Sequence, residues 1–305
     1  MKVFLTGATG FIGSRLCQKL SLAHEVVALC RSESADDALP EKVEAVRGDL
    51  EDAEHLRSLV AAARPEAVVH LAARIASTRD DTALARVNTQ GTAALIEAAV
   101  GAGVHRFLFA STVVTGDAGG ALLTEQSELP IKTPYGRSKQ TSEAELFARG
   151  DDGAIEPVVL RPSHVYGPGG WFADIVRDQA RGRFLVPGDG QNLWDMVHVD
   201  DVVRAFVLAL TAENPSRVYH VVDDAAVTLN EVAACIAAAL GRRPPRHVSV
   251  WIARLVAGRN AIDAVVRSAR SSNQRLRNEL HWEPAHPQSL RAIGDVVRTI
   301  MEAGG

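Results

Sequence analysis

Three glycines close to the N-terminus limit what the first segment of the chain can form. The segment TGATGFIG, residues 6–13, directly follows the apolar run VFL at residues 3–5 and places Gly7, Gly10 and Gly13 three residues apart. Glycine inside a helix costs about 1 kcal/mol relative to alanine, so the pattern indicates backbone that turns sharply or lies against another group. A strand, a glycine turn and a helix N-terminus together form an anion site, because free N–H groups and the helix dipole favour a phosphate. The spacing differs from the GxGxxG dinucleotide fingerprint, so a turn needed only for strand–helix packing is the alternative.

Short apolar runs alternate with helical patterns through the first 160 residues. The apolar runs predict strands at Lys2–Thr6, Glu25–Cys30, Val43–Asp49, Ala67–Ala73, Arg106–Thr112 and Pro157–Pro162. The helical patterns lie at Phe11–Leu22, Ala53–Ala63, Leu84–Ala102 and Tyr135–Arg149. Strands that are apolar at consecutive positions are buried on both faces, as in a parallel sheet covered by helices. The alternation therefore predicts an α/β fold with a doubly wound parallel sheet of the Rossmann type.

The pattern changes after Pro162. Residues 166–192 are rich in glycine and read as loops around one helix near Phe172–Ala180. Further elements are expected as strands at Asp195–Val199 and Val218–Val222 that rejoin the sheet, with a helix at Asp201–Leu210 between them and mostly helices after Thr228. We expect a first domain of residues 1–165, to which 193–225 return. Residues 166–192 and 226–305 are expected to form a smaller, mainly helical substrate-binding lobe at the carboxyl edge of the sheet, where open α/β sheets bind ligands.

Composition excludes several classes of protein. Of 305 residues, 47% are apolar and the formal net charge is −4, which gives no electrostatic case for a nucleic acid or an anionic membrane as partner. The three cysteines show no CxxC or Cys/His spacing, so no metal site and no disulfide framework is expected. With no signal-peptide pattern and no apolar stretch near the ~20 residues of a membrane helix, we expect a cytoplasmic protein.

Several motifs follow the glycine segment in order. They are GDL at residues 48–50, HLAA at 70–73, VNTQGT at 87–92, YGRSK at 135–139, RPSHVYGPG at 161–169 and VHVDD at 197–201. With these motifs the chain resembles the extended short-chain dehydrogenase/reductases, the family that includes nucleotide-sugar epimerases and dehydratases. The resemblance covers nearly the whole chain and is weakest past Thr228. It implies an NAD(P)-dependent oxidoreductase that binds a small-molecule substrate.

Tyr135 and Lys139 are four residues apart and therefore share one face of the expected helix. A free tyrosine has a pKa near ~10 and is a poor acid or base at neutral pH. A nearby ammonium favours the phenolate and lowers that pKa toward the useful range. We interpret the pair as the catalytic acid and the group that tunes it, and the resemblance implies that Lys139 also hydrogen-bonds the nicotinamide ribose. A surface tyrosine beside a solvated lysine is the alternative.

The family's third catalytic group is a Ser or Thr just after the fifth strand, where it hydrogen-bonds the reacting oxygen of the substrate. The match falls on Thr112, with Ser111 as the alternative, because the chain continues as VVTG where relatives have VYG, one residue shorter and with Thr115 in the tyrosine's place. A hydroxyl in this position can donate to developing negative charge. A strand-end pair that bonds only the backbone is the other interpretation.

The residue patterns and the resemblance together predict a set of cofactor contacts. They are Gly7, Thr9, Gly10, Phe11, Ile12, Gly13, Arg31, Asp49, Leu50, Leu71, Ala72, Ala73, Asn88, Tyr135, Lys139, Pro162 and Ser163. NAD-specific proteins of this type usually have an acidic residue at the end of the second strand, whereas here Cys30 stands in that place and Arg31 follows. A guanidinium pairs with a 2′-phosphate, so we favour NADP(H) over NAD(H), which stays possible if Arg31 is only a solvated loop charge.

The substrate side departs from the nucleotide-sugar pattern at Trp194, where such relatives usually place an arginine that grips the diphosphate. Arg177, Arg181 or Arg183 can compensate, although charged helix faces are usually just solvated. Trp194 is either an apolar wall for the substrate or a core residue. We assign no chemistry to His164 or His198.

Three functions are therefore open. The first is a ketoreductase or epimerase acting on a sugar, most simply a nucleotide-linked one. The second is an NADPH-dependent reductase of a non-nucleotide ketone or aldehyde, as in dihydroflavonol-reductase-like relatives, and the third is a non-catalytic dinucleotide sensor. The intact Tyr135–Lys139 pair disfavours the sensor, because a sensor needs no tuned phenol. By resemblance, a homodimer paired through the helices at Leu84–Ala102 and Tyr135–Arg149 is expected.

Overall fold

The computed structural model describes residues 1–33, 38–75 and 80–303, and these residues form two compact units. The first unit comprises Met1–Thr112, Pro134–Arg161 and Val203–Tyr219, and the second comprises Val113–Thr133, Pro162–Val202 and His220–Gly305. These boundaries differ from the expected ones, because residues 113–133, 162–165, 193–202 and 220–225 group with the second unit instead of the first. Among the described helices, none has the length and apolar character needed to cross a bilayer.

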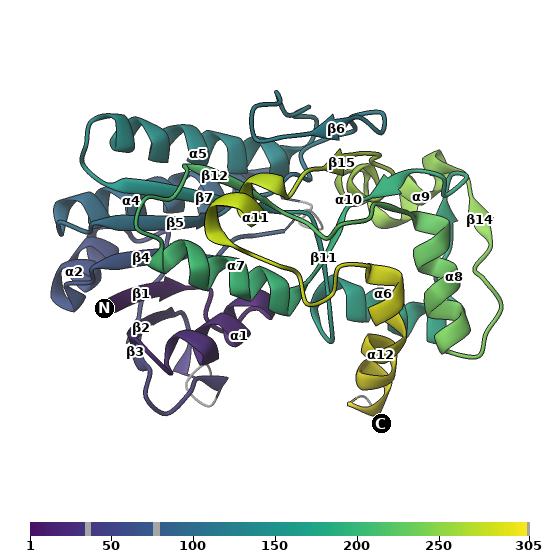
Figure 1. Cartoon of the computed structure of the whole chain (residues 1–305), viewed down its shortest axis with the longest axis horizontal. Coiled ribbons are helices and arrows are strands. Elements are labelled where there is room, and N and C mark those ends of the chain that lie inside the picture. Colours follow the sequence, from purple (N-terminus) through teal and green to yellow (C-terminus); the bar gives the residue numbers. More distant parts are fainter. Residues whose placement is uncertain (34–37, 76–79, 304–305) are drawn as a thin grey trace. The chain divides into compact units, whose positions relative to one another are not determined.

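A seven-stranded sheet forms the centre of the first unit, in the order β12-β7-β5-β4-β1-β2-β3 (Figure 1). Its strands are β1 (Lys2–Thr6), β2 (Glu25–Cys30), β3 (Glu44–Arg47), β4 (Ala67–His70), β5 (Arg106–Ala110), β7 (Glu156–Pro162) and β12 (Val218–Val221). The pairings of β1 with β2 and β4, of β2 with β3, and of β5 with β4 and β7 are all parallel. The order reverses direction at β1, as in a doubly wound sheet, so the expected fold class is confirmed.

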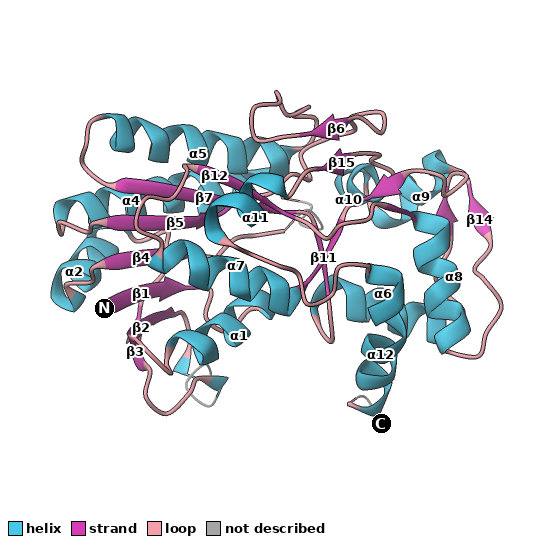
Figure 2. Ribbon diagram, in the orientation of Figure 1, coloured by secondary structure: helices cyan, strands magenta, loops and turns pink. Residues whose placement is uncertain are grey.

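Helices cover this sheet (Figure 2). They are α1 (Phe11–Leu20), α2 (Ala53–Ala63), α3 (Asp81–Ala85), the π-helix η2 (Arg86–Gly91), α4 (Thr92–Gly101), α5 (Pro134–Asp151) and α7 (Val199–Thr211). A buried core joins Phe4, Val68 and Phe107 of the sheet to apolar side chains of α2, α4 and α5. Burial on that scale is the main favourable contribution to folding.

The second unit combines helices with short two-stranded ladders. Its helices are α6 (Gly170–Ala180), α8 (Leu229–Ala239), α9 (Val250–Ala257), α10 (Arg259–Val265), α11 (Gln274–Leu280) and α12 (Ser289–Glu302). Its ladders pair β6 (Leu122–Leu123) with β15 (Arg270–Ser271), β8 (His164–Tyr166) with β11 (Met196–His198), β9 (Val186–Pro187) with β14 (His247–Val248), and β10 (Leu193–Trp194) with β13 (Val227–Thr228). Side chains of α6, α8 and α12 share one apolar core with Trp194.

Two of the expected elements are different in the structure. The expected strand Asp195–Val199 was predicted to rejoin the main sheet, but β11 pairs with β8 instead, outside the seven strands. The expected single helix Leu84–Ala102 is divided by η2 into α3 and α4. The reason for the first difference is that an apolar run shows that a strand is buried but does not show which strand it pairs with.

Candidate active site

The glycine turn joins β1 to α1 with very little space around it. Gly7 has a φ of +75°, and a Cβ there would lie 2.7 Å from the Ala72 amide nitrogen. A Cβ on Gly13 would lie 1.9 Å from the carbonyl oxygen of Gly7, so the turn packs directly against the first turn of α1. Gly10 is exposed and caps α1 without a side-chain hydrogen bond, and no acidic residue lies in the first turn. The helix therefore presents its N-terminus without a negative charge of its own, as an anion site requires.

A chain of hydrogen bonds ties the carboxyl ends of β1 and β4 to the helix over Asp81–Gly101. Thr6 Oγ1 lies 2.6 Å from His70 Nδ1, and His70 Nε2 lies 2.9 Å from Thr92 Oγ1. Thr92 donates to the carbonyl oxygen of Asn88 at 2.6 Å, which leaves its oxygen to accept from His70. His70 is therefore the Nε2–H tautomer, and it accepts at Nδ1 from Thr6. Burial, with a contribution from the charge of Lys139, lowers the pKa of His70 to about 3, so the ring is neutral.

Asn88 lies buried in the π-helix and connects three segments. Its amide nitrogen donates to the Arg74 carbonyl at 2.9 Å and to Ser138 Oγ at 3.2 Å, while its amide oxygen accepts from the Arg74 amide at 2.7 Å. Its own carbonyl also accepts from Ser142 Oγ at 2.8 Å. Since Ser138 and Ser142 lie on α5, Asn88 fixes that helix to the loop after β4. π-helical turns are frequent at functional sites, and this one contains a residue that the sequence analysis named.

Lys139 projects from α5 to the end of β5. Its Nζ donates to the Ala110 carbonyl oxygen at 2.8 Å and lies 4.7 Å from the centroid of the Phe109 ring. Burial lowers the pKa of Lys139 to about 7. A negative group close to Nζ would raise this pKa again, so that the amine would be fully protonated at neutral pH.

Tyr135 lies one turn before Lys139, with the lysine Nζ 6.0 Å from the centroid of its ring. Burial raises the pKa of Tyr135 to about 12. The direction is opposite to the expected one, because burial of the phenolate outweighs the effect of the Lys139 amine. At neutral pH the phenol is therefore protonated and suited to act as an acid.

Ser111 and Thr112 follow β5 directly and both are buried. The Ser111 amide donates to the Leu160 carbonyl at 2.8 Å, which extends the pairing of β5 with β7. Among the described residues, no partner hydrogen-bonds Ser111 Oγ. Because a buried hydroxyl without a partner is costly, this hydroxyl is suited to hydrogen-bond a bound molecule.

The remaining residues that are expected to bind the cofactor lie along the carboxyl edge of the seven-stranded sheet or belong to the second unit. Cys30, the last residue of β2, is buried, and Arg31, which follows it, is exposed. Thr9, Phe11, Ile12, Asp49, Leu50, Leu71, Ala72 and Ala73 lie in the turns after β1, β3 and β4 or at the start of α1, whereas Pro162 and Ser163 belong to the second unit. Since parallel strands end at the same edge, the turns after β1, β3, β4 and β5 meet there.

Trp194 is a core residue of the second unit. Only 1% of it is exposed, its ring stacks on His164 at 4.4 Å between centroids, and its Nε1 donates to the Val265 carbonyl at 2.8 Å. Burial lowers the pKa of His164 to about 3, so this ring is neutral. Arg177 pairs with Asp174 at 3.3 Å on the exposed face of α6.

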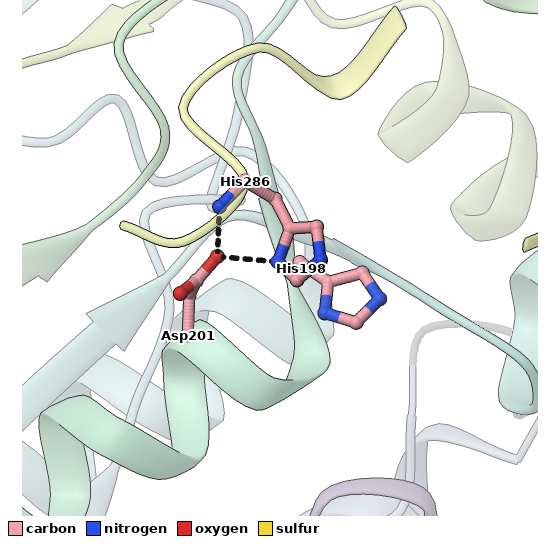
Figure 3. A group of neighbouring side chains, drawn as sticks. All are labelled: His198, Asp201 and His286. Carbon is pink, nitrogen blue, oxygen red and sulfur yellow. Dashed lines mark hydrogen bonds and ion pairs between the residues drawn. The ribbon is translucent and has the colours of Figure 1, made fainter. Parts of the chain in front are cut away.

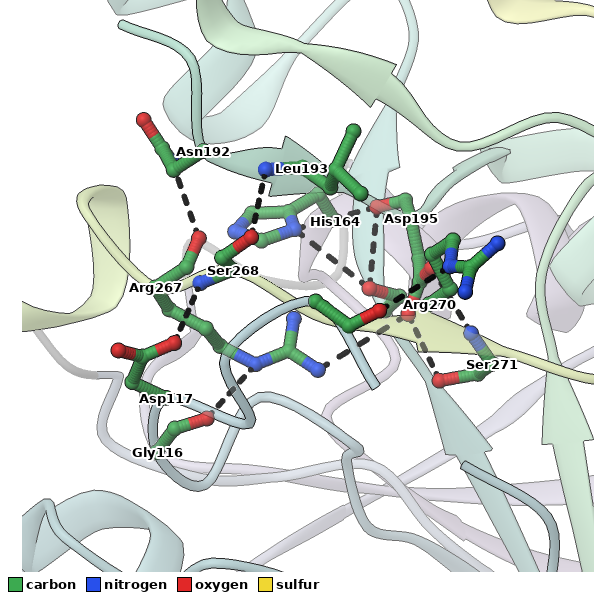
Figure 4. Close-up of polar contacts among 12 residues, drawn as sticks. Gly116, Asp117, His164, Asn192, Leu193, Asp195, Arg267, Ser268, Arg270 and Ser271 are labelled. Carbon is green, nitrogen blue, oxygen red and sulfur yellow. Dashed lines mark hydrogen bonds and ion pairs between the residues drawn. The ribbon is translucent and has the colours of Figure 1, made fainter. Parts of the chain in front are cut away.

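Arg267 is the buried arginine of the second unit (Figure 4). Its Nε donates to the Gly116 carbonyl at 3.1 Å, and its Nη2 lies 3.9 Å from Asp195 Oδ2. Asp195 also accepts from the amide and hydroxyl of Ser271, at 2.9 and 2.7 Å. Both Nη groups of Arg267 lack hydrogen-bond partners among the residues that the structure describes.

His198, Asp201 and His286 form a second cluster (Figure 3), with candidate ligand atoms within 4.8 Å of one another. Asp201 accepts from the amides of Ala285 and His286, at 2.7 and 3.0 Å, and from His286 Nδ1 at 3.1 Å. Its backbone carbonyl accepts from Trp282 Nε1 at 3.0 Å. Because these donors engage the carboxylate, we assign the cluster to anchoring the segment 282–286.

A model of the NAD dependent epimerase/dehydratase family matches residues 3–222. The chain belongs to this family. It is 32% identical to a 3-diazoavenalumate denitrifying reductase of Streptomyces, over 96% of this chain and 99% of the relative. It is 29% identical to a UDP-glucose 4-epimerase of Vibrio cholerae, over 95% and 92% of the two chains.

Solved structures agree with this membership of the epimerase/dehydratase family. The UDP-glucose 4-epimerase of Thermotoga maritima, determined with UDP-glucose, has a TM-score of 0.87 at 25% identity and full coverage of both chains. MoeE5, in complex with UDP-glucuronic acid and NAD, has a TM-score of 0.84 at 29% identity over 99% of this chain and 100% of that one. The chain is thus an enzyme of the NAD(P)-dependent, extended short-chain dehydrogenase/reductase kind, an oxidoreductase.

The sequence analysis gave no role to His70. It named the HLAA motif, which contains this residue, as part of the resemblance, but it assigned no contact to the imidazole. The available signal was a polar residue closing the apolar run AVVH at residues 67–70. A buried polar ring at a strand end requires partners, and Thr6 and Thr92 provide them.

Proposed function

We propose that this enzyme transfers hydride between a nicotinamide dinucleotide and a carbonyl or carbinol carbon of a sugar, most simply a nucleotide-linked one. One observation carries the proposal. The glycine turn after β1 and the Tyr135–Lys139 pair beside the end of β5 lie on the carboxyl edge of one parallel sheet. Ligands of doubly wound sheets bind along that edge, and a phenol that is protonated at neutral pH stands there with a buried amine.

The residues present suit a dinucleotide. The close approach of Gly7 and Gly13 to their neighbours leaves no space for side chains, while Gly10 is open at the N-terminus of α1. A pyrophosphate would be held by the free amides of that helix end. When bound, the nicotinamide supplies or accepts the hydride.

The chain's own side chains supply the proton and the positioning. Tyr135 donates its phenolic proton to the reacting oxygen, and Lys139 would hydrogen-bond the ribose of the dinucleotide. We assign orientation of the reacting oxygen to Ser111, because its buried hydroxyl has no partner within the described structure; Thr112 is the alternative. Asn88 holds α5, and with it Tyr135 and Lys139, in register with the sheet.

For the cofactor we favour NADP(H), although MoeE5 and other structures of this kind contain NAD. The support is local: β2 ends in Cys30 instead of an acid, and Arg31 is exposed immediately after it. A guanidinium at this place pairs with a 2′-phosphate, and no carboxylate at the strand end repels it.

A non-nucleotide substrate is the second candidate, and Trp194 supports it. The position where nucleotide-sugar relatives usually have an arginine holds a buried ring that bonds the Val265 carbonyl. In favour of an anionic substrate, the Nη groups of Arg267 have no hydrogen-bond partner among the described residues, beyond the 3.9 Å ion pair with Asp195, and they fit a diphosphate or a carboxylate. Arg267→Met should then raise KM for an anionic substrate with little change in kcat.

The test of the proposed activity is Tyr135→Phe. Removing the phenolic proton should lower turnover by about 10²–10⁴-fold while the affinity for the dinucleotide, measured by calorimetry, is retained. Tyr166→Phe is the matched control, because Tyr166 packs against Phe172 and His198 in the second unit and has no part in the proposed chemistry. Wild-type turnover in the Tyr135 variant would refute the assignment of the acid.

Native mass spectrometry of the purified enzyme distinguishes an internal redox cycle on a retained coenzyme from net reduction of a substrate by NADPH. Retained NAD indicates an internal redox cycle, as in epimerisation, and turnover of UDP-glucose should then follow without added coenzyme. Protein that is free of coenzyme and binds NADPH indicates net reduction, and NADPH consumption should follow with a ketone substrate. Failure to bind either coenzyme would refute both.

A further inference from the structure

The helix α9 presents large apolar side chains to solvent (labelled in Figure 1). The exposed fractions are 64% for Trp251, 38% for Ile252, 76% for Leu255 and 74% for Val256. At this spacing the four side chains share one side of the helix, while Ala253, on another side, is buried. Large apolar groups gathered on one exposed face mark an interaction surface.

We call these four exposed side chains, Trp251, Ile252, Leu255 and Val256, together the α9 face. A neighbouring loop fixes the segment that leads into α9, because the Val186 amide donates to the Arg246 carbonyl at 2.9 Å and the Gly188 amide donates to the Val248 carbonyl at 2.9 Å.

The segment around the α9 face is cationic, although the whole chain is not. Residues 232–262 contain no Asp or Glu and five arginines: Arg242, Arg243, Arg246, Arg254 and Arg259. Arg254 and Arg259 approach Asp263, at 2.7 and 3.6 Å. The other three precede α9 and are exposed, so positive charge gathers there in a chain whose net charge is −4.

We propose that the α9 face docks on the surface of an anionic lipid bilayer, with Trp251, Leu255 and Val256 entering the headgroup boundary. An amphipathic helix with Trp and Leu on one face and arginines close to it in sequence is typical of segments that bind such an interface, and the three exposed arginines in the chain that leads into α9 would contact lipid phosphates. Charge also argues against a second copy of the chain as occupant. A two-fold interface brings the same patch together from both copies, so the arginines of one copy would face those of the other.

This contact is peripheral and independent of the proposed reaction. The α9 face lies within the second unit, and none of its residues has a part in the chemistry assigned to β1, β5 and α5. A loss of membrane binding should therefore leave turnover of a water-soluble substrate unchanged.

The first experiment is sedimentation of the full chain with vesicles of phosphatidylglycerol and phosphatidylcholine in equal parts, and with vesicles of phosphatidylcholine alone. We expect binding to the anionic vesicles, weakened by high salt. A blue shift of tryptophan emission should accompany binding and disappear in Trp251→Phe. The other three tryptophans lie outside the α9 face: Trp194 and Trp282 are 1% and 0% exposed, and Trp171 packs against Trp194. No binding to the anionic vesicles, or equal binding to both kinds, overturns the proposal.

Variants then test the apolar side chains of the α9 face and the three exposed arginines separately. Leu255→Asp should weaken vesicle binding at least about tenfold, whereas Leu22→Asp, at a leucine that is 77% exposed elsewhere, should not change it. Reversing Arg242, Arg243 and Arg246 to Glu should have a similar effect, and the same change at the exposed Arg57, Arg291 and Arg298 should not. Self-association of the protein without lipid, lost in Leu255→Asp, would identify a second copy as the occupant and overturn the proposal. Thermal melts confirm that each variant is folded.

Discussion

Lys139 is buried within the first unit, with only 3% of the residue exposed. Its pKa falls from the ordinary 10.5 to about 7 because burial removes water from the ammonium. Above the unfolded pKa, the lysine is neutral in both states and adds no pH dependence. As the pH falls toward 7, the unfolded chain binds a proton that the folded chain does not, so stability decreases over that range and then levels off.

We therefore expect Lys139→Met to stabilise the cofactor-free protein. The gain in the free energy of unfolding should be on the order of a few kcal/mol at pH 6 and should shrink as the pH approaches 10. Urea denaturation across this pH range measures it, with the exposed Lys19→Met as the control. Identical pH profiles for wild type and Lys139→Met would contradict the lowered pKa.

Arg31 decides the predicted coenzyme preference. Arg31→Ala should weaken NADPH binding about 10-fold to 100-fold, as expected for the loss of a charge-assisted contact with phosphate, and should leave NADH binding nearly unchanged. Isothermal titration calorimetry with both coenzymes measures the difference. Equal losses for the two coenzymes would remove the case for a 2′-phosphate contact.

Individual residues show which features of the site could be predicted from the sequence. The spacing of Tyr135 and Lys139 predicted that both lie on one helix, and the spacing of the glycines predicted a tight turn before α1; the structure has both features, while the chemistry of these residues stays a prediction. The direction of the Tyr135 pKa shift was predicted wrongly for the isolated chain, because desolvation depends on neighbours that are distant in sequence. The role of His70 was missed for the same reason, since its partners are Thr6 and Thr92.

At the scale of elements, the turn between β1 and α1 gives a paired prediction. Gly13→Ala places a Cβ 1.9 Å from the Gly7 carbonyl oxygen, so it should cost about 3 kcal/mol or more of folding free energy. Gly294→Ala, in α12, meets no atom within 4 Å and should stabilise the protein by about 1 kcal/mol. Chemical denaturation of both variants measures this contrast, and similar effects at the two positions would show that Gly13 is not packed as described.

Elements were predictable where periodicity alone defines them. The bounds of β1, β2 and α2 were predicted correctly, because apolar runs and one clear helical period mark them. The π-helix η2 was not, because it inserts residues into a helix whose apolar period looks continuous from Leu84 to Ala102. Periodicity also cannot predict which strand a short strand such as β11 pairs with, because the pairing depends on contacts with a segment that is distant in sequence.

At the scale of the whole molecule, the exposed face of α5 bears on assembly. Arg137, Thr141, Ala144 and Ala148 are all exposed, and their spacing places them along one side of the helix. Apart from Arg137 these side chains are small, so another helix can approach closely. On this basis, and by the resemblance noted above, we expect a homodimer paired through α4 and α5.

Ala144→Arg tests that expectation. A bulky charge in the middle of the α5 face should block close helix approach and leave its guanidinium without a partner in the interface, so the mass in solution should fall from that of a dimer to that of a monomer. Light scattering coupled to size-exclusion chromatography measures the mass, and Ala61→Arg, at an exposed alanine of α2, is the control. A monomeric wild-type protein, or an Ala144→Arg variant that remains dimeric, would show that this face is not the interface. Because the Tyr135–Lys139 pair lies on the same helix, a monomeric variant that keeps its turnover would also show that α5 is held in place by Asn88 and the sheet, and not by the partner subunit.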